Sequence, residues 1–498
     1  MGSGGTATND FATCVTSRAS EDPDAVAVVA GHRAISYEEL EARIRRAESA
    51  LSFRGINERD RVAVCSVNRI EIVELLFACC RLGATLLVIN NRLTSAEIST
   101  QFDDCRPSLV LTEVGFMDRF DTGRWRVEDL DTVANEPYVR STSPPGSLGR
   151  PDHPALLVYT SGTTGRPKGA VLSQRSLLHT MYNAIDHERL STDSTVLAVL
   201  PMFHVGGLNI QLTPCLFAGG TVILEEHFDP ARLLELLRQH RPTHLALVPA
   251  AMRSLAEATT QLGDDLSSLG ALTCGSSIVP PDLIRYFAKH DISVVQVYGA
   301  TETGPTAIVL DPNDADRIGS CGKPALHTEL RVIASTGREA MVGEVGELRL
   351  RGPNLFVGYW EDPSSTEAAF ADGWYRTGDL GFVDKDGFTY VTGRVKELII
   401  SGGENVYPAE IEQVLEQHDR IESAAVIGRP DERWGESPAA FVVPSASPAP
   451  TEAELSAWVR TRLAGYKQPR LWIFVDELPM TSLGKVRKDE LRRALEEG

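Results

Sequence analysis

The stretch Tyr159-Thr-Ser-Gly-Thr-Thr-Gly-Arg-Pro-Lys-Gly169 decides how the rest of the chain is interpreted. It leaves an apolar run, 155–159, that predicts a buried strand. Glycines let backbone approach an anion, hydroxyl and N–H groups donate hydrogen bonds, and lysine adds a positive charge. The stretch therefore predicts a polyphosphate-binding loop rather than a solvated turn of small residues. The predicted contacts are Thr160, Ser161, Gly162, Thr163, Thr164, Gly165 and Lys168.

This loop differs from the common nucleotide-binding pattern G-x-x-x-x-G-K-[ST]. That pattern needs glycine where Pro167 stands and Ser or Thr where Gly169 stands. The phosphate chemistry is therefore expected to belong to another class of enzyme.

Composition limits both the architecture and the partners. A chain of 498 residues exceeds one hydrophobic core, so two or more domains are expected. With 49 Lys and Arg against 68 Asp and Glu, the net charge of -19 disfavours nucleic acid as a partner. An anionic ligand would need a local positive site such as the loop above.

Cysteine spacing and the N-terminus bear on the cellular compartment. The eight cysteines form no Cys-x-x-Cys pair and no cluster with histidines, so neither zinc nor a disulfide framework is predicted. No apolar run approaches the roughly 18 residues of a membrane span, and no signal peptide is evident. A cytoplasmic protein is expected. Gly2 and Thr6 fit a loose myristoylation pattern, but a flexible tail is the favoured interpretation.

The order of elements predicts an α/β fold class. Apolar runs alternate with helical patterns over residues 25–110 and 197–300, which indicates parallel α/β layering. Residues 318–392 carry short, glycine-punctuated β runs, and 394–498 read as a compact α+β unit. We expect a large N-terminal domain, 1–393, with parallel α/β subdomains and a small β-rich subdomain, followed by a smaller α+β domain, 394–498.

The loop resembles the signature of the adenylate-forming superfamily, in its acyl- and aryl-coenzyme A synthetase branch. A second motif in the family order is present at 298–302, Tyr-Gly-Ala-Thr-Glu. The resemblance implies that Tyr298 stacks on adenine beside Gly299, that Thr301 holds the α-phosphate, and that Glu302 coordinates Mg²⁺. A flat ring, a hydroxyl donor and a hard anionic oxygen suit these roles. Taken alone, Glu302 would be interpreted as a surface carboxylate.

Three further segments continue the resemblance. Residues 374–379, Trp-Tyr-Arg-Thr-Gly-Asp, resemble the ribose motif, in which Asp379 accepts hydrogen bonds from both sugar hydroxyls. Residues 393–410 resemble the hinge and thiol-tunnel motif. This resemblance implies that Arg394 contacts the ribose and that Lys396 is the pivot. It also implies that Gly402 and Gly403 lie along the path of the thiol arm.

The last motif, 480–485, implies that Lys485 is the catalytic lysine, which contacts the substrate carboxylate and the α-phosphate during adenylation. In isolation this lysine would be interpreted as a solvent-exposed side chain. The resemblance covers nearly the whole chain, and over the first 150 residues it is one of general pattern only.

The family implies a two-step reaction with ATP, Mg²⁺ and coenzyme A. A carboxylic acid is adenylated with release of pyrophosphate, the C-terminal domain rotates, and coenzyme A takes the acyl group. The predicted catalytic residues are Lys485, Thr301, Glu302 and His204.

The acyl pocket is predicted around residues 201–208, where His204 orients substrate or, alternatively, has a structural role. No Asp stands between Pro201 and Gln211, which disfavours amino acids, and no Arg or Lys does, which weakens a dicarboxylate. The two glycines of this stretch are expected to leave volume, so a bulky apolar acid is favoured: fatty, aromatic or polycyclic. The predicted lining is His204, Val205, Gly206, Gly207, Gly275, Gly299 and Ala300, and Gly275 and Ser276 are also assigned to the nucleotide site.

Two rival functions stay open at this point. One is an adenylating enzyme that loads a carrier protein instead of coenzyme A. The other is a catalytically silent nucleotide- or acyl-binding protein. The chain could also pair as a homodimer.

Overall fold

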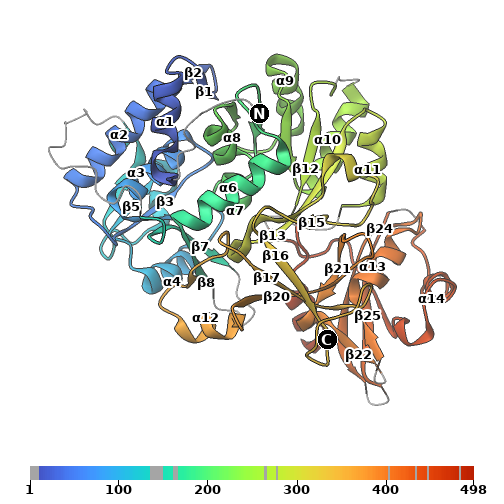
Figure 1. Cartoon of the computed structure of the whole chain (residues 1–498). Coiled ribbons are helices and arrows are strands. Elements are labelled where there is room, and N and C mark those ends of the chain that lie inside the picture. Colours follow the sequence, from blue (N-terminus) through green and yellow to red (C-terminus); the bar gives the residue numbers. More distant parts are fainter. Residues whose placement is uncertain are drawn as a thin grey trace. The chain divides into compact units, whose positions relative to one another are not determined.

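The computed structural model describes residues 10–134, 150–160, 167–262, 266–275, 279–401, 404–431, 434–445, 448–481 and 484–497. These residues form two compact units (Figure 1). The first holds the described residues up to Glu329 together with Leu350–Tyr375. The second holds Leu330–Arg349 and the described residues from Arg376 onward. Among the described residues, no helix is long and apolar enough to cross a membrane.

The first unit contains a large, mainly parallel sheet. Its central strands pair in parallel, whereas β2, β14 and β15 run antiparallel to their neighbours. The parallel strands are buried and apolar because helices cover the faces of a parallel sheet. The strand order is β15 (Lys323–Pro324), β14 (Gly304–Val309), β13 (Ser293–Ala300), β12 (Ala271–Cys274), β11 (His244–Leu247), β9 (Thr195–Ala198), β10 (Thr221–Leu224), β1 (Val26–Ala30) and β2 (Arg33–Ser36).

A second sheet of the first unit carries the predicted phosphate loop at one side. Its strands β7, β4, β3, β5 and β6 are parallel, and β8 and β18 extend it antiparallel beyond β7. The order is β18 (Gly358–Tyr359), β8 (Lys168–Ser173), β7 (Pro154–Thr160), β4 (Thr85–Val88), β3 (Arg61–Cys65), β5 (Leu109–Thr112) and β6 (Val127–Asp129).

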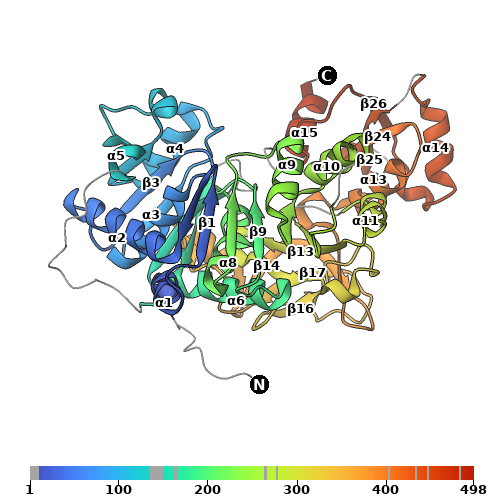
Figure 2. The ribbon, with the colours of Figure 1, turned by 90° about the horizontal axis from the view of Figure 1, so that it is seen from above.

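Helices fill the connections of both sheets. Figure 2 shows α1, α2 and α3 grouped on one side of the first unit and α9, α10 and α11 on the other. Helix α3 is buried along most of its length because it lies within the main core of this unit. The helices are α1 (Cys14–Glu21), α2 (Tyr37–Phe53), α3 (Ile70–Leu82), α4 (Ser95–Cys105), α5 (Leu130–Ala134), α6 (Gln174–Glu188), α7 (Val205–Asn209), α8 (Leu212–Ala218), α9 (Pro230–His240), α10 (Pro249–Leu262), α11 (Pro281–Ala288) and α12 (Pro363–Ala369).

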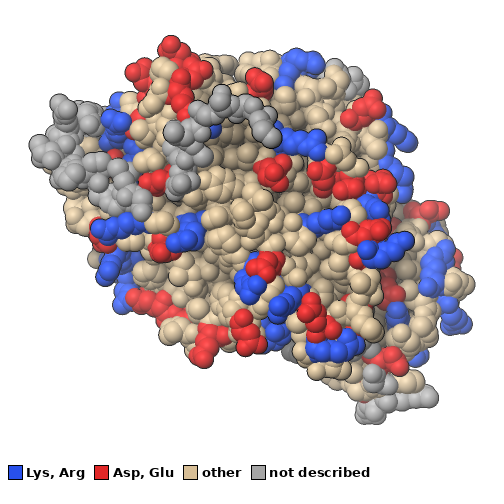
Figure 3. Space-filling model, in the orientation of Figure 1, with Lys and Arg blue, Asp and Glu red and all other residues tan. Residues whose placement is uncertain are grey.

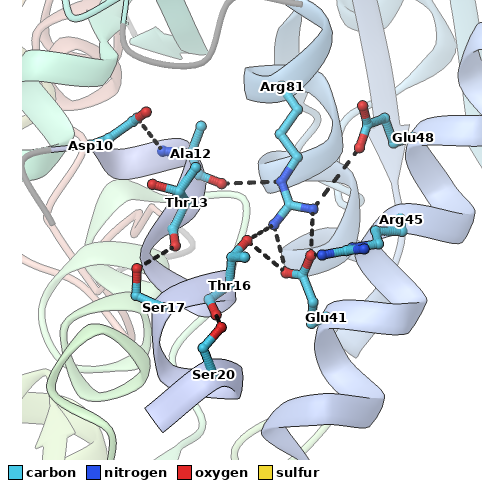
Figure 4. Close-up of polar contacts among 10 residues, drawn as sticks. All are labelled: Asp10, Ala12, Thr13, Thr16, Ser17, Ser20, Glu41, Arg45, Glu48 and Arg81. Atoms are coloured by element: carbon cyan, nitrogen blue, oxygen red, sulfur yellow. Dashed lines mark hydrogen bonds and ion pairs between the residues drawn. The ribbon is translucent and has the colours of Figure 1, made fainter. Parts of the chain in front are cut away.

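A buried arginine joins the first three helices (Figure 4). The guanidinium of Arg81, on α3, lies 2.7 Å from a carboxylate oxygen of Glu41 on α2 and donates to Thr16 Oγ1 and the Ala12 carbonyl. Only 4% of the Arg81 side chain and 8% of the Glu41 side chain are exposed. Glu41 also accepts from Arg45 at 2.6 Å. These contacts satisfy two charges that would otherwise be buried without partners.

In the described part of the second unit, two sheets combine with the helices α13, α14 and α15. Residues 399–474 form a five-stranded sheet in which the long strands β24 and β25 pair antiparallel and β26 runs parallel to β25. Helices α13 and α14 cover one face with an apolar core, and α15 contributes to a second core. The elements are β22 (Ile399–Ser401), β23 (Glu404–Val406), α13 (Pro408–Glu416), β24 (Ile421–Asp431), β25 (Gly435–Pro444), α14 (Glu452–Arg460), β26 (Leu471–Phe474) and α15 (Lys488–Glu497).

The predicted β-rich segment 318–392 is present and does not belong to one unit. Its strands are β16 (Glu329–Ile333), β17 (Gly346–Arg351), β19 (Phe370–Ala371), β20 (Trp374–Val383) and β21 (Thr389–Arg394), besides the short β15 and β18. Residues 330–349 and 376–393 fall in the same compact unit as the C-terminal segment. The domain boundary predicted at 393–394 marks where the C-terminal domain is expected to rotate, and it stays a prediction.

The face shown in Figure 3 carries Lys and Arg side chains interspersed with Asp and Glu. No broad basic patch is visible among the described residues of that face.

Candidate active site

The ends of the predicted phosphate loop are fixed by a β-hairpin. Thr160 ends β7 and Lys168 begins β8, and the two residues are cross-strand partners. The Thr160 hydroxyl donates to the Lys168 carbonyl at 3.4 Å. The strand pairing therefore determines where the loop lysine emerges from the sheet. Five predicted contacts, Ser161, Gly162, Thr163, Thr164 and Gly165, lie outside the described residues.

The second motif forms a tight turn at the end of the central sheet. Strand β13 ends at Ala300, the 3₁₀ turn Thr301–Thr303 follows, and β14 returns antiparallel. The Asn354 side chain donates to the Thr303 carbonyl at 2.7 Å, and the Phe356 N–H donates to the Glu302 carbonyl at 2.8 Å. Thr301 and Tyr298 are half-buried on this hairpin.

In the structure, Lys168 of the loop and Glu302 of the turn both contact Tyr359. The Tyr359 hydroxyl donates to Glu302 Oε1 at 3.0 Å, and Lys168 Nζ lies 5.2 Å from the centre of the Tyr359 ring. Lys168 Nζ also donates to Ser365 Oγ at 2.7 Å. Glu302 is only 8% exposed, so it is not an ordinary surface carboxylate. A cation and a buried carboxylate at one point suit a polyphosphate with its metal.

Tyr359 and Ser365 were not predicted from the sequence. Tyr359 enters the site because β18 pairs with β8, opposite Ala170. Ser365 lies in the first turn of α12, which begins after its N-cap Asp362. A two-residue strand gives no periodic signal, so only the resemblance of the surrounding segment could have pointed to them.

The groups around this tyrosine have shifted pKa values. Burial raises the pKa of Tyr359 above its usual value, and the Glu302 charge raises it further. Burial also raises the pKa of Tyr375, again assisted by Glu302. Hydrogen bonds from Ser365 and Ser364 lower the pKa of Asp362 to about 2, and the Lys168 ammonium contributes. At neutral pH both tyrosines are therefore neutral donors, while Asp362 is charged.

Part of the predicted acyl pocket lies on the short helix α7, which is called the acyl wall below. His204 caps it, with its ring centroid 4.6 Å from that of Phe203, and α7 packs against α6 and β14. Val205 is buried on this helix. A Cβ on Gly206 would meet only Ile210 Cδ1, at 3.5 Å, so this glycine does leave space.

The prediction that Gly207 leaves volume for the acyl group is wrong. A Cβ there would lie 2.2 Å from the Pro201 carbonyl oxygen, so the neighbouring backbone already occupies the space. Gly299 is comparable, because its Cβ would lie 2.1 Å from the Gly304 carbonyl oxygen. The tight packing of the chain itself requires both glycines.

The remaining glycine of the predicted pocket, Gly275, directly follows strand β12. A Cβ on Gly275 would lie 3.0 Å from Val297 Cγ2 on the neighbouring strand. Ala300 lies at the end of β13, paired with Gly304. Ser276 lies outside the described residues.

The predicted ribose residues are neighbours in the second unit. Asp379 on β20 and Arg394 on β21 are cross-strand partners, and Arg394 Nε lies 2.9 Å from Asp379 Oδ1. Lys396 is exposed in the 3₁₀ turn Val395–Glu397 that follows. Gly402 and Gly403 lie outside the described residues.

Lys485 stands on a tight turn of the second unit and is exposed. Its N–H donates to Thr481 Oγ1 at 3.0 Å, and the Thr481 N–H donates to the Lys485 carbonyl at 2.7 Å. Gly484 has φ +71°, a conformation that favours glycine. Three residues later, Lys488 is held by Glu412 at 2.7 Å and Glu397 at 3.3 Å. These contacts fix the base of the lysine turn.

The chain belongs to the family of AMP-binding enzymes, the adenylate-forming superfamily. Residues 15–360 match the family described as "AMP-binding enzyme", and residues 410–485 match "AMP-binding enzyme C-terminal domain". The predicted membership is therefore confirmed, as is the mixed α/β fold with a large N-terminal and a smaller C-terminal domain.

Its relatives are coenzyme A ligases. The chain is 42% identical to the indoleacetate–CoA ligase of Aromatoleum aromaticum (strain DSM 19018 / LMG 30748 / EbN1), over 95% of each chain. It is 39% identical to a feruloyl-CoA synthase of Amycolatopsis sp, over 96% of this chain and 97% of that one. Among solved structures, it resembles o-succinylbenzoate CoA synthetase from Bacillus subtilis in complex with its acyl-adenylate intermediate. That match has a TM-score of 0.89 and 30% identity, and it covers 96% of this chain and 98% of the other.

Proposed function

We propose that this chain is an AMP-forming acid–coenzyme A ligase that uses ATP and Mg²⁺ and acts on an aromatic monocarboxylic acid. The observation that carries the proposal is the meeting of Lys168 and Glu302 at Tyr359. Relatives named for indoleacetate and feruloyl-CoA favour the aromatic class over fatty acids.

The first half-reaction forms a mixed anhydride. A carboxylate oxygen of the acid attacks the α-phosphorus of ATP, the bond to the β-phosphate oxygen breaks, and pyrophosphate leaves. Lys168 and Thr301 bind the phosphates, and Lys485 neutralises the repulsion between carboxylate and phosphate. Binding and electrostatic alignment are the main sources of acceleration in such transfers.

Residues of each unit are assigned to the nucleotide in this proposal. The Tyr298 ring stacks on adenine. Asp379 accepts from the ribose hydroxyls, with Arg394, its ion-pair partner, beside it. The contacts predicted for the loop residues Ser161–Gly165 and for Ser276 belong to the same proposal.

The buried Glu302 would supply one carboxylate ligand to Mg²⁺, which prefers one or two carboxylates together with substrate phosphates and water. When bound, Mg²⁺ neutralises charge on the departing pyrophosphate. Tyr359 orients the carboxylate through its hydroxyl.

The second half-reaction transfers the acyl group. The coenzyme A thiolate attacks the acyl carbon, the bond to the phosphate oxygen breaks, and AMP leaves. His204 orients the acid near the thiol path, and Gly402 and Gly403 give the thiol arm room beside the backbone. The segment 394–498 pivots at Lys396 between the two steps.

The test is pyrophosphate release with ATP and Mg²⁺ against aromatic, fatty, dicarboxylic and amino acids, with and without coenzyme A. We expect release with aromatic acids and a thioester only when coenzyme A is present. Lys485→Ala should abolish adenylation, whereas the exposed Lys385→Ala should not. ATP binding without release for any acid would contradict the proposal and favour a silent binder.

Thioester formation only on a carrier protein would instead favour the carrier-loading function. A cytoplasmic location, where ATP and free coenzyme A are available, and the absence of a nucleic-acid partner complete the proposal. A homodimer is the alternative to a monomer, and sedimentation velocity distinguishes them.

A further inference from the structure

A cluster of polar side chains lies inside the first unit, beneath the predicted acyl wall. Glu188, the last residue of α6, is buried there. Its Oε1 accepts from Thr273 Oγ1 at 2.6 Å, and its Oε2 accepts from Gln211 Nε2 at 3.0 Å. Gln211 caps α8 and is 3% exposed. The Gln211 amide is therefore oriented by a carboxylate that needs its N–H₂ group.

The other end of this amide is left without a donor. Gln211 Oε1 is buried, and none of the described residues donates a hydrogen bond to it. A buried acceptor without a partner is energetically unfavourable, because it has lost its hydrogen bonds to water. When Glu188 is ionised, turning the amide over would place its oxygen against a Glu188 oxygen, so the orientation with Nε2 toward Glu188 is the favoured one. The structure thus holds an oriented acceptor whose partner must come from outside this set of residues.

The amide borders the wall assigned to the acyl group. Gln211 lines a narrow cavity together with Gly206, Gly207, Leu200 and Ala246. Gly206 is the glycine of α7 that leaves space for additional atoms. The volume of this cavity is about 10 Å³, so it admits one water-sized donor group, such as the tip of a hydroxyl or N–H, and no ring.

We propose that Gln211 is a specificity-determining residue, whose side-chain oxygen accepts a hydrogen bond from an N–H or O–H group at the distal end of the acid. This inference rests on the proposed function and narrows its substrate class to aromatic acids that carry such a donor. A site built around a hydrogen bond rejects an analogue that lacks the donor, because the buried acceptor is then left unsatisfied. The competing occupant of the cavity is a single water molecule.

The experiment compares matched acids on the full-length enzyme. The pairs are indole-3-acetate with 1-benzothiophene-3-acetate, and 4-hydroxycinnamate with cinnamate, which differ in the donor and little in shape. The measured quantity is the ratio of kcat/KM for pyrophosphate release within each pair. In the wild type we expect at least one pair to favour the donor acid tenfold or more.

Three variants separate specificity from structure. Gln211→Met removes the acceptor and keeps the length, so the ratio should fall to about one. The double variant Glu188→Met with Gln211→Met removes both polar partners, and it gives the same ratio if the single variant does not fold. Thr259→Val removes a buried hydroxyl of α10 that donates to the Leu255 carbonyl, so the ratio should stay at the wild-type value.

The outcomes distinguish this inference from the proposed function. Pyrophosphate release with a ratio near one in the wild type would overturn the role of Gln211, assign the cavity to water, and leave the ligase function standing. A high ratio that persists in the Gln211 variants would also overturn it. No release with any acid would contradict the ligase function itself, and this inference with it.

Discussion

Tyr359 contacts two charged groups that lie far apart in the sequence: Lys168 through its ring and Glu302 through its hydroxyl. Removing the hydroxyl oxygen therefore removes one interaction and keeps the other. Tyr359→Phe keeps the ring beside Lys168 and removes the hydroxyl that donates to Glu302. A hydrogen bond to a charged group contributes about 1.5–3 kcal/mol. We expect the Mg²⁺ concentration for half-maximal pyrophosphate release to rise about tenfold.

A magnesium titration of pyrophosphate release measures this effect, with Tyr286→Phe on α11 of the same unit as the control. An unchanged half-maximal concentration in Tyr359→Phe would show that Tyr359 does not orient Glu302 for the metal.

Glu188 makes stability depend on pH. Burial raises its pKa from 4.5 to about 7, although hydrogen bonds from Thr273 and Gln211 oppose the shift. Between these values the folded state binds more protons than the unfolded state, so the free energy of unfolding falls as pH rises from 4.5 to about 7. The loss is on the order of 3 kcal/mol. Glu188→Gln should remove this contribution.

Urea unfolding of wild type and Glu188→Gln at pH 5 and pH 7.5 measures the difference, with the exposed Glu235→Gln as control. The neighbouring His187 acts in the opposite direction, because burial lowers its pKa to about 4, and its stabilising contribution is lost as pH falls from 6.5. It is present in both proteins and cancels in the comparison. An equal pH dependence in the two proteins would refute the assignment to Glu188.

At the scale of elements, Arg81 determines how α1, α2 and α3 are held together (Figure 4). Arg81→Met leaves the buried Glu41 without its main partner, which typically costs 3–5 kcal/mol. Arg81→Met combined with Glu41→Leu removes both charges, so most of the lost stability should return. Urea unfolding of the two single variants and the double variant measures the coupling. A double variant as unstable as the sum of the singles would show that the pair is not coupled.

The sequence predicted elements well wherever a motif coincided with regular structure. The glycine- and threonine-rich loop does connect two strands, and Glu302 does sit in a turn after a central strand. Glycines were harder to interpret, because sequence does not show which atoms lie beside them. Gly206 faces space, whereas Gly207 faces the Pro201 backbone. Tyr359 was missed because only the long-range pairing of β18 with β8 brings it to the site.

The predicted pivot, which concerns the whole molecule, lies in a short segment with an ion pair on each side. Within the second unit, Arg394 is anchored to Asp379 on β20, and Glu397 is anchored to the half-buried Lys488 of α15. The Glu412 contact of Lys488 ties that anchor to α13. Only Val395 and Lys396 lie between the two anchors. The pivot at Lys396 stays a prediction, and these two anchors define the short segment in which it can be tested.

Restricting the backbone at that position should separate the two half-reactions. Proline fixes its own φ near −65° and restricts the residue before it, so Lys396→Pro limits the rotation available between the anchors. Lys396→Ala removes the same side chain and keeps the backbone free, which makes it the matched control. If the orientation held by proline is the adenylating one, pyrophosphate release from acid and ATP should persist, while thioester formation from isolated acyl-adenylate and coenzyme A should fall about a hundredfold or more. The opposite orientation would reverse the two effects, and either result requires that one half-reaction is lost while the other is retained. Equal loss of both, or wild-type rates for both, would place the pivot elsewhere in the chain.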